Sequence, residues 1–570
     1  MKIYHFFLIK PSLYDDEGYV IRFSKGVLPS NTLIVLNGLF KYHLKNLQKE
    51  YLYEYKITLL DEIVDKINIS KIYKQVKINK EIGVVMLSGV QSNQITRATD
   101  LALEFKKLGF FVFVGGFHVS GILSIFKKPD FSLEILLKNH ISIVAGEVEN
   151  SLPILLKDIF QSTVQNVYNF LDEKPNLDTP ILPEIPKNYL KKFAVSNFST
   201  LDLGRGCPYQ CSFCTIINVH GNLMRFRDPQ VIKNYILENY FKNQVDYYFF
   251  TDDNFARNKN WREILNVLIQ IRKTYKIPLR FMIQVDTLAY KIPDFISLLK
   301  EAGCTQVFVG MESLNSENLK LVGKRQNKVE DFKNMIETWN SVGINVHTGY
   351  IIGFPYDTPD SVKKDVEYLN QIGVQQASFF ILTPLPGSID HKKMLEENQI
   401  HNFDFNFYDS FHLVWNHKNF SPKKMEETFF LIWQQFYSFK NIIKRIYKLS
   451  NLSFSMAENM LGNYLWYKYS IIVHKLHPMV CGFHRKKSFS ERRPFLKKNL
   501  ISFIKFILKR TFEIHLEMLK TFRIGLEFFF LWSIFYILKI LKKHRKKFFM
   551  ENKSAKIYTP ESITKVEILD

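Results

Sequence analysis

The chain has 570 residues, of which 46% are hydrophobic and 23% are charged. This length suits three or four domains, and the composition excludes a disordered, collagenous or multi-span membrane protein. Lysine and arginine outnumber aspartate and glutamate by 77 to 55, and the net charge of +22 favours an anionic partner, either nucleic acid or a lipid surface.

The cysteines indicate the cellular compartment. There are five, at positions 207, 211, 214, 304 and 481, with none in the first 206 residues. An odd, clustered set is not a disulfide framework. The first apolar stretch, in MKIYHFFLIK, is too short for a signal peptide. Both features predict a protein of the reducing cytoplasm.

Residues 1–170 alternate between short apolar runs and helical patterns. The pattern predicts strands at 4–9, 83–88, 111–114 and 142–145, and helices at 30–46, at 98–108 and from about 153. This alternation is typical of a Rossmann-like, doubly wound parallel sheet. Four prolines then mark residues 171–195 as a linker.

The alternation resumes over residues 196–395 in longer units. We expect strands at 200–203, 247–251, 280–284, 306–310, 345–351 and 377–382, with helices such as 261–275, 293–302 and 329–341 between them. Six such units predict a (βα)6 partial TIM barrel, whose loops after the strands carry the chemistry. Residues 396–570 lose this alternation and are expected to form a mostly helical, basic C-terminal domain.

The strongest motif follows the first barrel strand and reads GRGCPYQCSFC. It places Cys207, Cys211 and Cys214 at C-x3-C-x2-C spacing in a glycine-bounded loop. Three thiolates can hold a soft metal centre, and on a four-iron cluster they leave one iron open for an exogenous ligand. The alternative is a zinc site with His220 as the fourth ligand, although a second C-x2-C knuckle is absent.

This motif resembles that of the radical S-adenosylmethionine (radical SAM) enzymes. The segments TDDNF at 251–255, VGMES at 309–313 and GYIIGFP at 349–355 are similar to later barrel motifs of that family. The resemblance implies that the three cysteines hold a 4Fe-4S cluster and that the open iron binds S-adenosylmethionine. It assigns as further contacts of that cofactor Phe213 beside the adenine, Asp252, Asp253, Glu312, Ser313, Gly349 and Gly353. The residues alone leave other roles open: the aspartates suit a helix cap, and the glycines suit close backbone packing.

Two segments of the first domain, VGGFHVS at 114–120 and VAGEVE at 144–149, resemble the cobalamin-binding domain that precedes the barrel in one class of these enzymes. The resemblance implies a cobalamin site that includes Gly115, Gly116, His118, Gly146 and Glu147. The chain lacks the Asp-x-His-x-x-Gly motif with which other proteins ligate cobalt. A sheet that binds no cobalamin, and a histidine that only bonds to neighbouring backbone, are the alternatives.

The C-terminal region carries most of the excess charge. Residues 485–547 contain 18 lysines and arginines against 4 glutamates. Apolar residues at 500, 503, 504, 507 and 508 have the spacing of an amphipathic helix, and the apolar run at 528–538 is too short to span a bilayer. The segment suits an interfacial membrane anchor or a lid over the barrel mouth; nucleic-acid binding is the least favoured, because no reader motif accompanies the charge.

The resemblance implies an enzyme. Reductive cleavage of S-adenosylmethionine would give a 5′-deoxyadenosyl radical, and cobalamin would carry the methyl group that methylates, or takes part in rearranging, an unactivated carbon. The substrate is an unknown small molecule or a lipid or isoprenoid, and a flavodoxin or ferredoxin would donate electrons to an enzyme in the cytoplasm or on the inner membrane face. The alternatives are a cobalamin-independent radical SAM enzyme and a non-enzymatic iron–sulfur or zinc protein that docks to membrane or nucleic acid. A transfer-RNA methylthiotransferase would need a second three-cysteine cluster before the barrel, where the chain has no cysteine.

Overall fold

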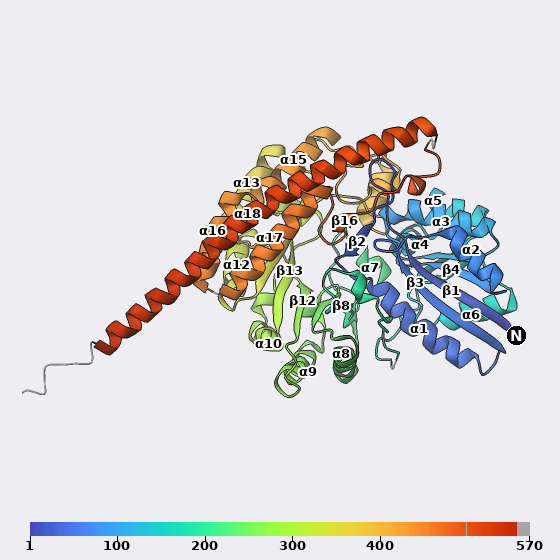
Figure 1. Cartoon of the computed structure of the whole chain (residues 1–570), viewed down its shortest axis with the longest axis horizontal. Helices are drawn as coiled ribbons and strands as arrows, with labels where there is room; N and C mark the ends of the chain where they lie inside the picture. The colour runs from blue at the N-terminus through green and yellow to red at the C-terminus, as the bar shows by residue number, and fades with distance from the viewer. Residues whose placement is uncertain (180, 453, 497–498, 556–570) are drawn as a thin grey trace, which may run out of the picture.

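Two parallel six-stranded sheets follow one another along the chain, and a layer of helices completes the molecule (Figure 1). The computed structural model describes residues 1–570 except 180, 453, 497–498 and 556–570. The first sheet has the strand order β3-β1-β4-β5-β6-β7. Its strands are β1 (Lys2–Lys10), β3 (Tyr53–Asp61), β4 (Ile82–Leu87), β5 (Phe111–Gly115), β6 (Ser142–Gly146) and β7 (Val167–Phe170).

Helices cover both faces of this sheet, as the sequence predicts for a doubly wound fold. Alternate residues of β1 point to opposite faces: Phe6 packs with α1 (Asn31–Leu47) and α6 (Leu152–Gln161), whereas Phe7 belongs to the other core. That second core includes α2 (Ile69–Ile78), α3 (Ile95–Lys107), α4 (Phe117–Phe126) and α5 (Phe131–Lys138). Burial on both faces explains why the central strands are continuous apolar runs.

The linker is a packed segment that crosses the first domain. The Glu184 amide donates to the Ile34 carbonyl at 3.0 Å, and the Tyr189 hydroxyl donates to Asp61 Oδ2 at 3.0 Å. The first contact holds the linker against α1 and the second holds it against β3, before the second sheet begins.

The second sheet is the expected partial barrel. Its strand order is β15-β14-β13-β12-β11-β8, all neighbours are parallel, and no pairing joins β15 to β8 within the described residues. The strands are β8 (Phe198–Leu201), β11 (Tyr247–Phe250), β12 (Arg280–Val285), β13 (Cys304–Glu312), β14 (Asn345–Ile352) and β15 (Gln376–Ile381). The main helices between them are α8 (Pro229–Asn243), α9 (Trp261–Lys273), α10 (Phe295–Ala302), α12 (Phe332–Ser341) and α13 (Pro359–Ile372).

Five further helices follow the barrel, and one of them, α17, closes the barrel where its strands begin. They are α14 (Ile389–Glu396), α15 (Pro422–Phe436), α16 (Phe439–Leu452), α17 (Phe454–His474) and α18 (Leu500–Ala555). From α17, the Asn463 amide donates to Gln376 Oε1 at 3.0 Å, and the Tyr467 hydroxyl lies 3.4 Å from His347 Nε2. Gln376 and His347 are the first and third residues of their strands, so α17 covers the end of the barrel opposite to its mouth. The lid that the sequence allowed falls in α18, which packs on α17 through Glu527 and so lies away from the barrel mouth there.

A short two-stranded sheet ties the two ends of the chain together. β2 (Phe23–Gly26) pairs antiparallel with β16 (Gly482–Arg485). Beside it, Arg22 and Glu491 form a buried ion pair at 2.5 Å. Cys481 is buried here in a small apolar cluster with Leu13, Ile21 and Phe23.

The amphipathic helix and the apolar run expected near the C-terminus are parts of a single helix, α18. Leu500–Lys542 is long and apolar enough to cross a membrane by length and composition, with a mean hydropathy of 1.9 over its most apolar 18-residue window. The run 528–538 is too short to span by itself, but it is part of a helix that meets the length and composition criteria. The structure does not describe the side chains of the basic residues 543–547.

Candidate functional site

The three motif cysteines lie in one loop at the carboxyl end of the first barrel strand. The loop leaves β9 (Gly204–Arg205), which pairs with β10 (Arg225–Phe226), and ends at α7 (Ile216–Val219). Gly206 has φ +102°, and a Cβ there would lie 2.5 Å from the Leu223 carbonyl oxygen. The turn that leads into Cys207 therefore requires glycine.

The thiols share a largely buried environment with one cation. Burial raises the pKa of all three thiols, that of Cys214 to about 12, while the nearby Lys324 ammonium acts in the opposite direction on Cys211. Lys324 is itself buried. A positive charge beside buried thiols favours their thiolate form, which is the form that binds metal.

The three thiols suit an iron–sulfur cluster. No group of three His, Cys, Asp or Glu side chains converges on one point in the part of the chain that the structure describes. Each cysteine of a four-iron cluster binds a different iron, so such a cluster does not require the donors to converge on one point. His220, the zinc ligand considered from the sequence, has its Nδ1 3.0 Å from Asp253 Oδ2.

Asp252 and Asp253 hold the cysteine loop in place. Asp252 Oδ1 accepts from the Leu203 amide at 2.7 Å, and burial raises the pKa of this carboxyl to about 8. Asp253 Oδ2 accepts from the Gly206 amide at 2.8 Å, as well as contacting His220. Their observed contacts are with the loop backbone, and neither caps a helix.

Lys324 joins the end of β13 to the cysteine loop. Its ammonium donates to Glu312 and lies 5.7 Å from the centre of the Phe213 ring. Glu312 has φ +66°, a left-handed conformation that is strained for a residue with a side chain. Ser313 is buried and its hydroxyl accepts from the Asn315 amide at 3.1 Å. The structure thus brings Phe213 and Glu312 together around one buried cation.

Gly349 in β14 and Gly353 directly after it are each explained by a different structural constraint. A Cβ at Gly349 would lie 2.8 Å from the Phe308 ring inside the barrel. Gly353 has φ +95°, and its amide donates to Asp357 Oδ2 at 2.9 Å. Both observations support the close-packing role that the residue type suggested.

A cavity of about 630 Å³ separates the carboxyl ends of the two sheets. The wall that the N-terminal domain contributes includes Gly115, Gly116, Gly146 and Glu147, and the wall that the barrel contributes includes Asp253. Helix α1 adds an apolar side, which consists of Val35, Leu36, Leu39 and Phe40. Parallel sheets bind ligands at this edge.

His118 does not line this cavity, which corrects its expected place among the cobalamin contacts. Its ring is fully buried, with Nε2 2.8 Å from the Ser132 hydroxyl and Nδ1 3.3 Å from that of Ser92. Burial lowers the pKa of this histidine to about 3, aided by nearby His391. His118 therefore fixes the loops behind the cavity as a neutral side chain.

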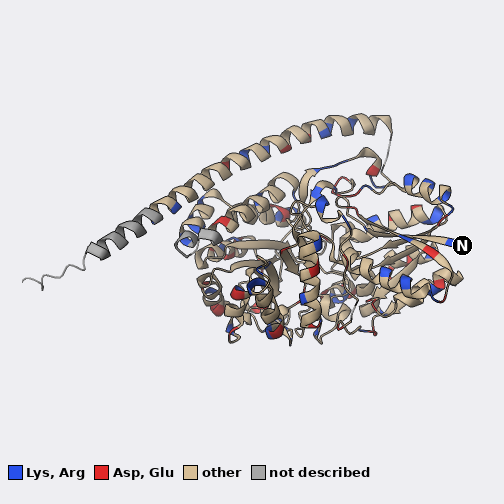
Figure 2. Ribbon diagram, turned by 60° about the horizontal axis from the view of Figure 1, so that its bottom comes forward, with Lys and Arg blue, Asp and Glu red and all other residues tan. Residues whose placement is uncertain are grey.

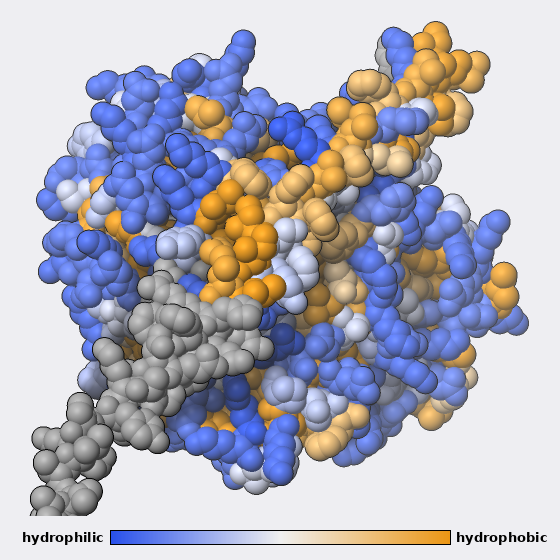
Figure 3. Space-filling model, turned by 60° about the vertical axis from the view of Figure 1, so that its left-hand side comes forward, coloured by the Kyte–Doolittle hydropathy of each residue, from blue (hydrophilic) through white to orange (hydrophobic). Residues whose placement is uncertain are grey.

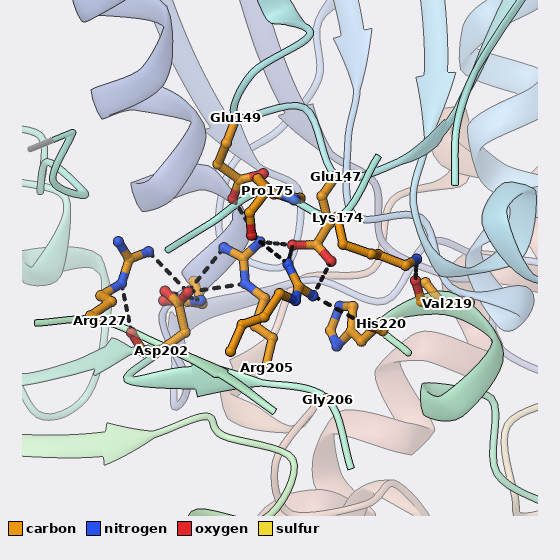
Figure 4. Close-up of polar contacts among 12 residues, drawn as sticks. Glu147, Glu149, Lys174, Pro175, Asp202, Arg205, Gly206, Val219, His220 and Arg227 are labelled. Carbon is orange, nitrogen blue, oxygen red and sulfur yellow. Dashed lines mark hydrogen bonds and ion pairs between the residues drawn. The ribbon is translucent and has the colours of Figure 1, made fainter. Parts of the chain in front are cut away.

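A network of buried ion pairs connects the cavity wall to the cysteine loop (Figure 4). Glu147 Oε2 lies 2.6 Å from Arg205 Nη1, and its Oε1 lies 2.6 Å from Arg225 Nη2. Glu149 also pairs with Arg205, which in turn contacts Asp202. The expected cobalamin contact Glu147 is thus engaged with arginines of the barrel. The sequence reasoning missed Glu149, Arg205 and Arg225, although Arg205 lies within the cysteine motif.

Comparison with known proteins agrees with this geometry. The family model of the radical SAM superfamily matches residues 201–369. Over 427 residues the chain is 28% identical to bacteriochlorophyllide d C-8(2)-methyltransferase of Chlorobaculum tepidum, which covers 71% of this chain and 88% of that protein. It is 26% identical over 251 residues to the hopanoid C-2 methylase of Rhodopseudomonas palustris, with 43% and 46% of the two chains covered.

A solved structure has the same arrangement of domains. The radical SAM methyltransferase TsrM of Kitasatospora setae, with cobalamin and a [4Fe-4S] cluster bound, superimposes with a TM-score of 0.55. The match covers 77% of this chain and 89% of that one at 14% identity, and it supports the fold. Together with the cysteine loop and the two facing sheets, these findings show that residues 201–369 form a radical SAM domain, and that the chain is similar to enzymes in which a Rossmann-like domain precedes the barrel.

Proposed function

We propose that this enzyme is a cobalamin-dependent radical SAM methyltransferase that acts on an unactivated carbon. The observation that carries the proposal is the cavity between the two sheets, because it lies beside the cysteine loop and is walled by both domains. A sheet that had lost its cofactor would not need a roomy, partly polar cavity at its ligand-binding edge.

The residues present fit the cofactors of this chemistry. Three thiols would hold the 4Fe-4S cluster, the residues around Lys324 would border S-adenosylmethionine, and the strand ends of the first sheet would hold cobalamin. The chemistry that these groups supply when bound is one-electron cleavage of S-adenosylmethionine and delivery of a methyl group, with the substrate hydrogen leaving in 5′-deoxyadenosine.

The chain's own contribution is to position and shield the reactants. The aspartates fix the cysteine loop, and the pair of Glu147 with Arg205 holds the cavity wall against it. Alignment of this kind replaces encounters in solution by a fixed geometry. An external flavodoxin or ferredoxin in the cytoplasm would supply the electrons.

The substrate class that we favour is a lipid or isoprenoid. The apolar side that α1 gives the cavity supports this choice, and one relative is named as a hopanoid methylase. Rearrangement of such a substrate without net methylation is the alternative outcome.

Anaerobic reconstitution tests the proposal directly. The protein is loaded with iron and sulfide, titrated with hydroxocobalamin, reduced and assayed for 5′-deoxyadenosine. We expect about four irons per chain, retention of one cobalamin and formation of 5′-deoxyadenosine. Cofactor cleavage without any retention of cobalamin would instead identify a cobalamin-independent enzyme. Loading with iron but no cleavage, with or without cell extract, would refute the enzymatic proposal.

A further inference from the structure

Helix α18 lies along the molecule with one face against it. The inward positions recur every three or four residues and carry the side chains that are buried or half-buried: Ser502, Phe506, Arg510, Glu513, Glu517, Lys520, Ile524, Leu531 and Phe535. Glu527 fixes this face, because it pairs with Lys468 and accepts from the Tyr464 hydroxyl at 2.5 Å, both on α17. The helix is therefore packed along the protein body, and this placement does not suit a segment that spans a bilayer on its own.

The outward face of α18 is apolar. Large side chains that are about half to two-thirds exposed recur along it: Ile504, Leu508, Leu519, Phe522, Phe529 and Ile537. Figure 3 shows a hydrophobic band along this helix, and in Figure 2 most of the helix is free of charged residues. Such a contiguous apolar surface on a water-soluble body marks an interaction site.

The charges of α18 are divided in a way that suits an anionic surface. All three carboxylates between residues 500 and 542 face inward, where Glu513 and Glu517 pair with Arg510, and Glu527 pairs with Lys468. The exposed charged side chains of this part of the helix are cationic, at positions 505, 509, 523 and 539. A cationic rim beside an apolar face is the pattern of helices that lie in the interface of an anionic membrane.

A basic hollow of about 270 Å³ lies beside the first turns of the helix. It is lined by five cations, Lys487, Arg492, Lys505, Lys509 and Arg510, but only two carboxylates, Glu17 and Glu513. Lys487 is 4% exposed there, where it makes ion pairs with both carboxylates. The excess of positive charge suits a phosphate group.

We propose that α18 seats this enzyme on an anionic lipid surface, with the outward apolar face in the interface and a lipid phosphate in the basic hollow. The 43 residues of Leu500–Lys542 would form a seat of about 65 Å at 1.5 Å per residue. The proposal is independent of the chemistry at the cysteine loop, because it concerns a face of the molecule that needs no cofactor.

Flotation of the full chain with vesicles tests the apolar face. Wild type should float with phosphatidylcholine vesicles that contain phosphatidylglycerol, and the variant F522E/F529E should bind more than about tenfold less, because charged groups would enter the apolar layer. F241E is the matched control, since Phe241 is 71% exposed on α8. Both positions in α18 are exposed, so unchanged thermal unfolding should accompany the loss. Equal flotation of the double variant and wild type would overturn the proposal.

The basic hollow needs a second pair of variants. K505A/K509A should weaken binding to the anionic vesicles by about fivefold per lysine and leave weak binding to pure phosphatidylcholine unchanged. K320A is the control, because Lys320 is an exposed lysine paired with Glu317 at 2.8 Å, as Lys509 is with Glu17. Loss of the same size with K320A would refute a role for the hollow.

Three other occupants are distinguished in the same experiments. Sedimentation that shows a dimer abolished by F522E/F529E, without any flotation, would assign the face to a second copy of the chain. Binding to a DNA or RNA duplex but not to anionic vesicles would assign the charge to nucleic acid. Inorganic phosphate that binds wild type but not K505A/K509A, without flotation, would leave the hollow as a site for free phosphate. Each of these results would overturn the lipid proposal.

Discussion

The Glu147 carboxylate and the Arg205 guanidinium meet at 2.6 Å, and they come from different domains. Glu147 follows the last residue of β6, and Arg205 lies two positions before Cys207. The contact joins the wall of the expected cobalamin site to the loop of the expected cluster. The ion pair therefore fixes the position of one of these sites relative to the other.

Replacing Glu147 by Gln should destabilise the protein by about 3 kcal/mol, because Arg205 and Arg225 would lose a buried partner. Urea unfolding measures the change. The surface pair of Glu134 with Lys138 provides the control, and E134Q should cost less than about 1 kcal/mol. Equal effects of the two substitutions would show that the inter-domain pair contributes no more than an exposed one.

Replacing Cys211 by Ala should prevent assembly of a four-iron cluster, because one iron would lack its thiolate. Iron analysis and the visible spectrum after anaerobic reconstitution measure this. Cys304 is also buried but lies at the start of β13, where its thiol donates to the Gln306 carbonyl. C304A should keep the wild-type iron content, and unchanged iron in C211A would refute the ligand assignment.

Replacing Gly116 by Ala should both destabilise the protein, by about 2 kcal/mol or more, and weaken retention of hydroxocobalamin. Its φ is +142°, and an added Cβ would lie 2.2 Å from the Val90 amide nitrogen, so the turn at the cavity must move. Gly109 is the matched control: its φ is +84°, but an added Cβ meets nothing within 4 Å. G109A should cost about 1 kcal/mol and leave cobalamin retention unchanged.

The stability of the protein should fall between pH 7 and pH 5, in part through His118. Burial lowers the pKa of this side chain to about 3 in the folded state, whereas the unfolded chain takes up the proton near pH 6.5. The unfolded state thus binds more protons below pH 6.5, and about 2 kcal/mol is lost by pH 5 from this residue.

The substitution H118Q removes this titration, so it should reduce the difference in unfolding free energy between pH 7 and pH 5 by that amount. Urea unfolding at both pH values measures it, and any constant cost of the substitution cancels. If H118Q showed the same difference in unfolding free energy between the two pH values as wild type, the role of His118 in the pH dependence would be contradicted.

The sequence predicted the central strands because they are buried on both faces. β1, β4 and β5 are nearly continuous apolar runs, which is the signal that burial leaves. β3 was missed because it is an edge strand whose sequence, YEYKITLLD, mixes charged and apolar residues. Only its pairing with β1 identifies it, and that pairing is not visible in a local window.

At the site, the sequence predicted the cysteines because a local motif carries them. It could not predict the role of Glu147, because the partners Arg205 and Arg225 are 58 and 78 positions away along the chain. The sequence prediction divided the C-terminal helix into two segments for a similar reason. Its composition changes from amphipathic to apolar, while its backbone continues as one helix. Patterns that span a few helical turns could be predicted from the sequence, whereas contacts between domains could not.

The pairing of β2 with β16 also bears on how the protein is made. β2 ends at Gly26, and its partner begins at Gly482. At a synthesis rate of 5–20 residues per second, the ribosome needs roughly half a minute to a minute and a half to supply that partner. The apolar side chains of Leu13, Ile21 and Phe23, which Cys481 helps to cover, stay without their final neighbours throughout that interval. We therefore expect this apolar segment of the nascent chain to need protection, for example by chaperones, until β16 has been synthesised.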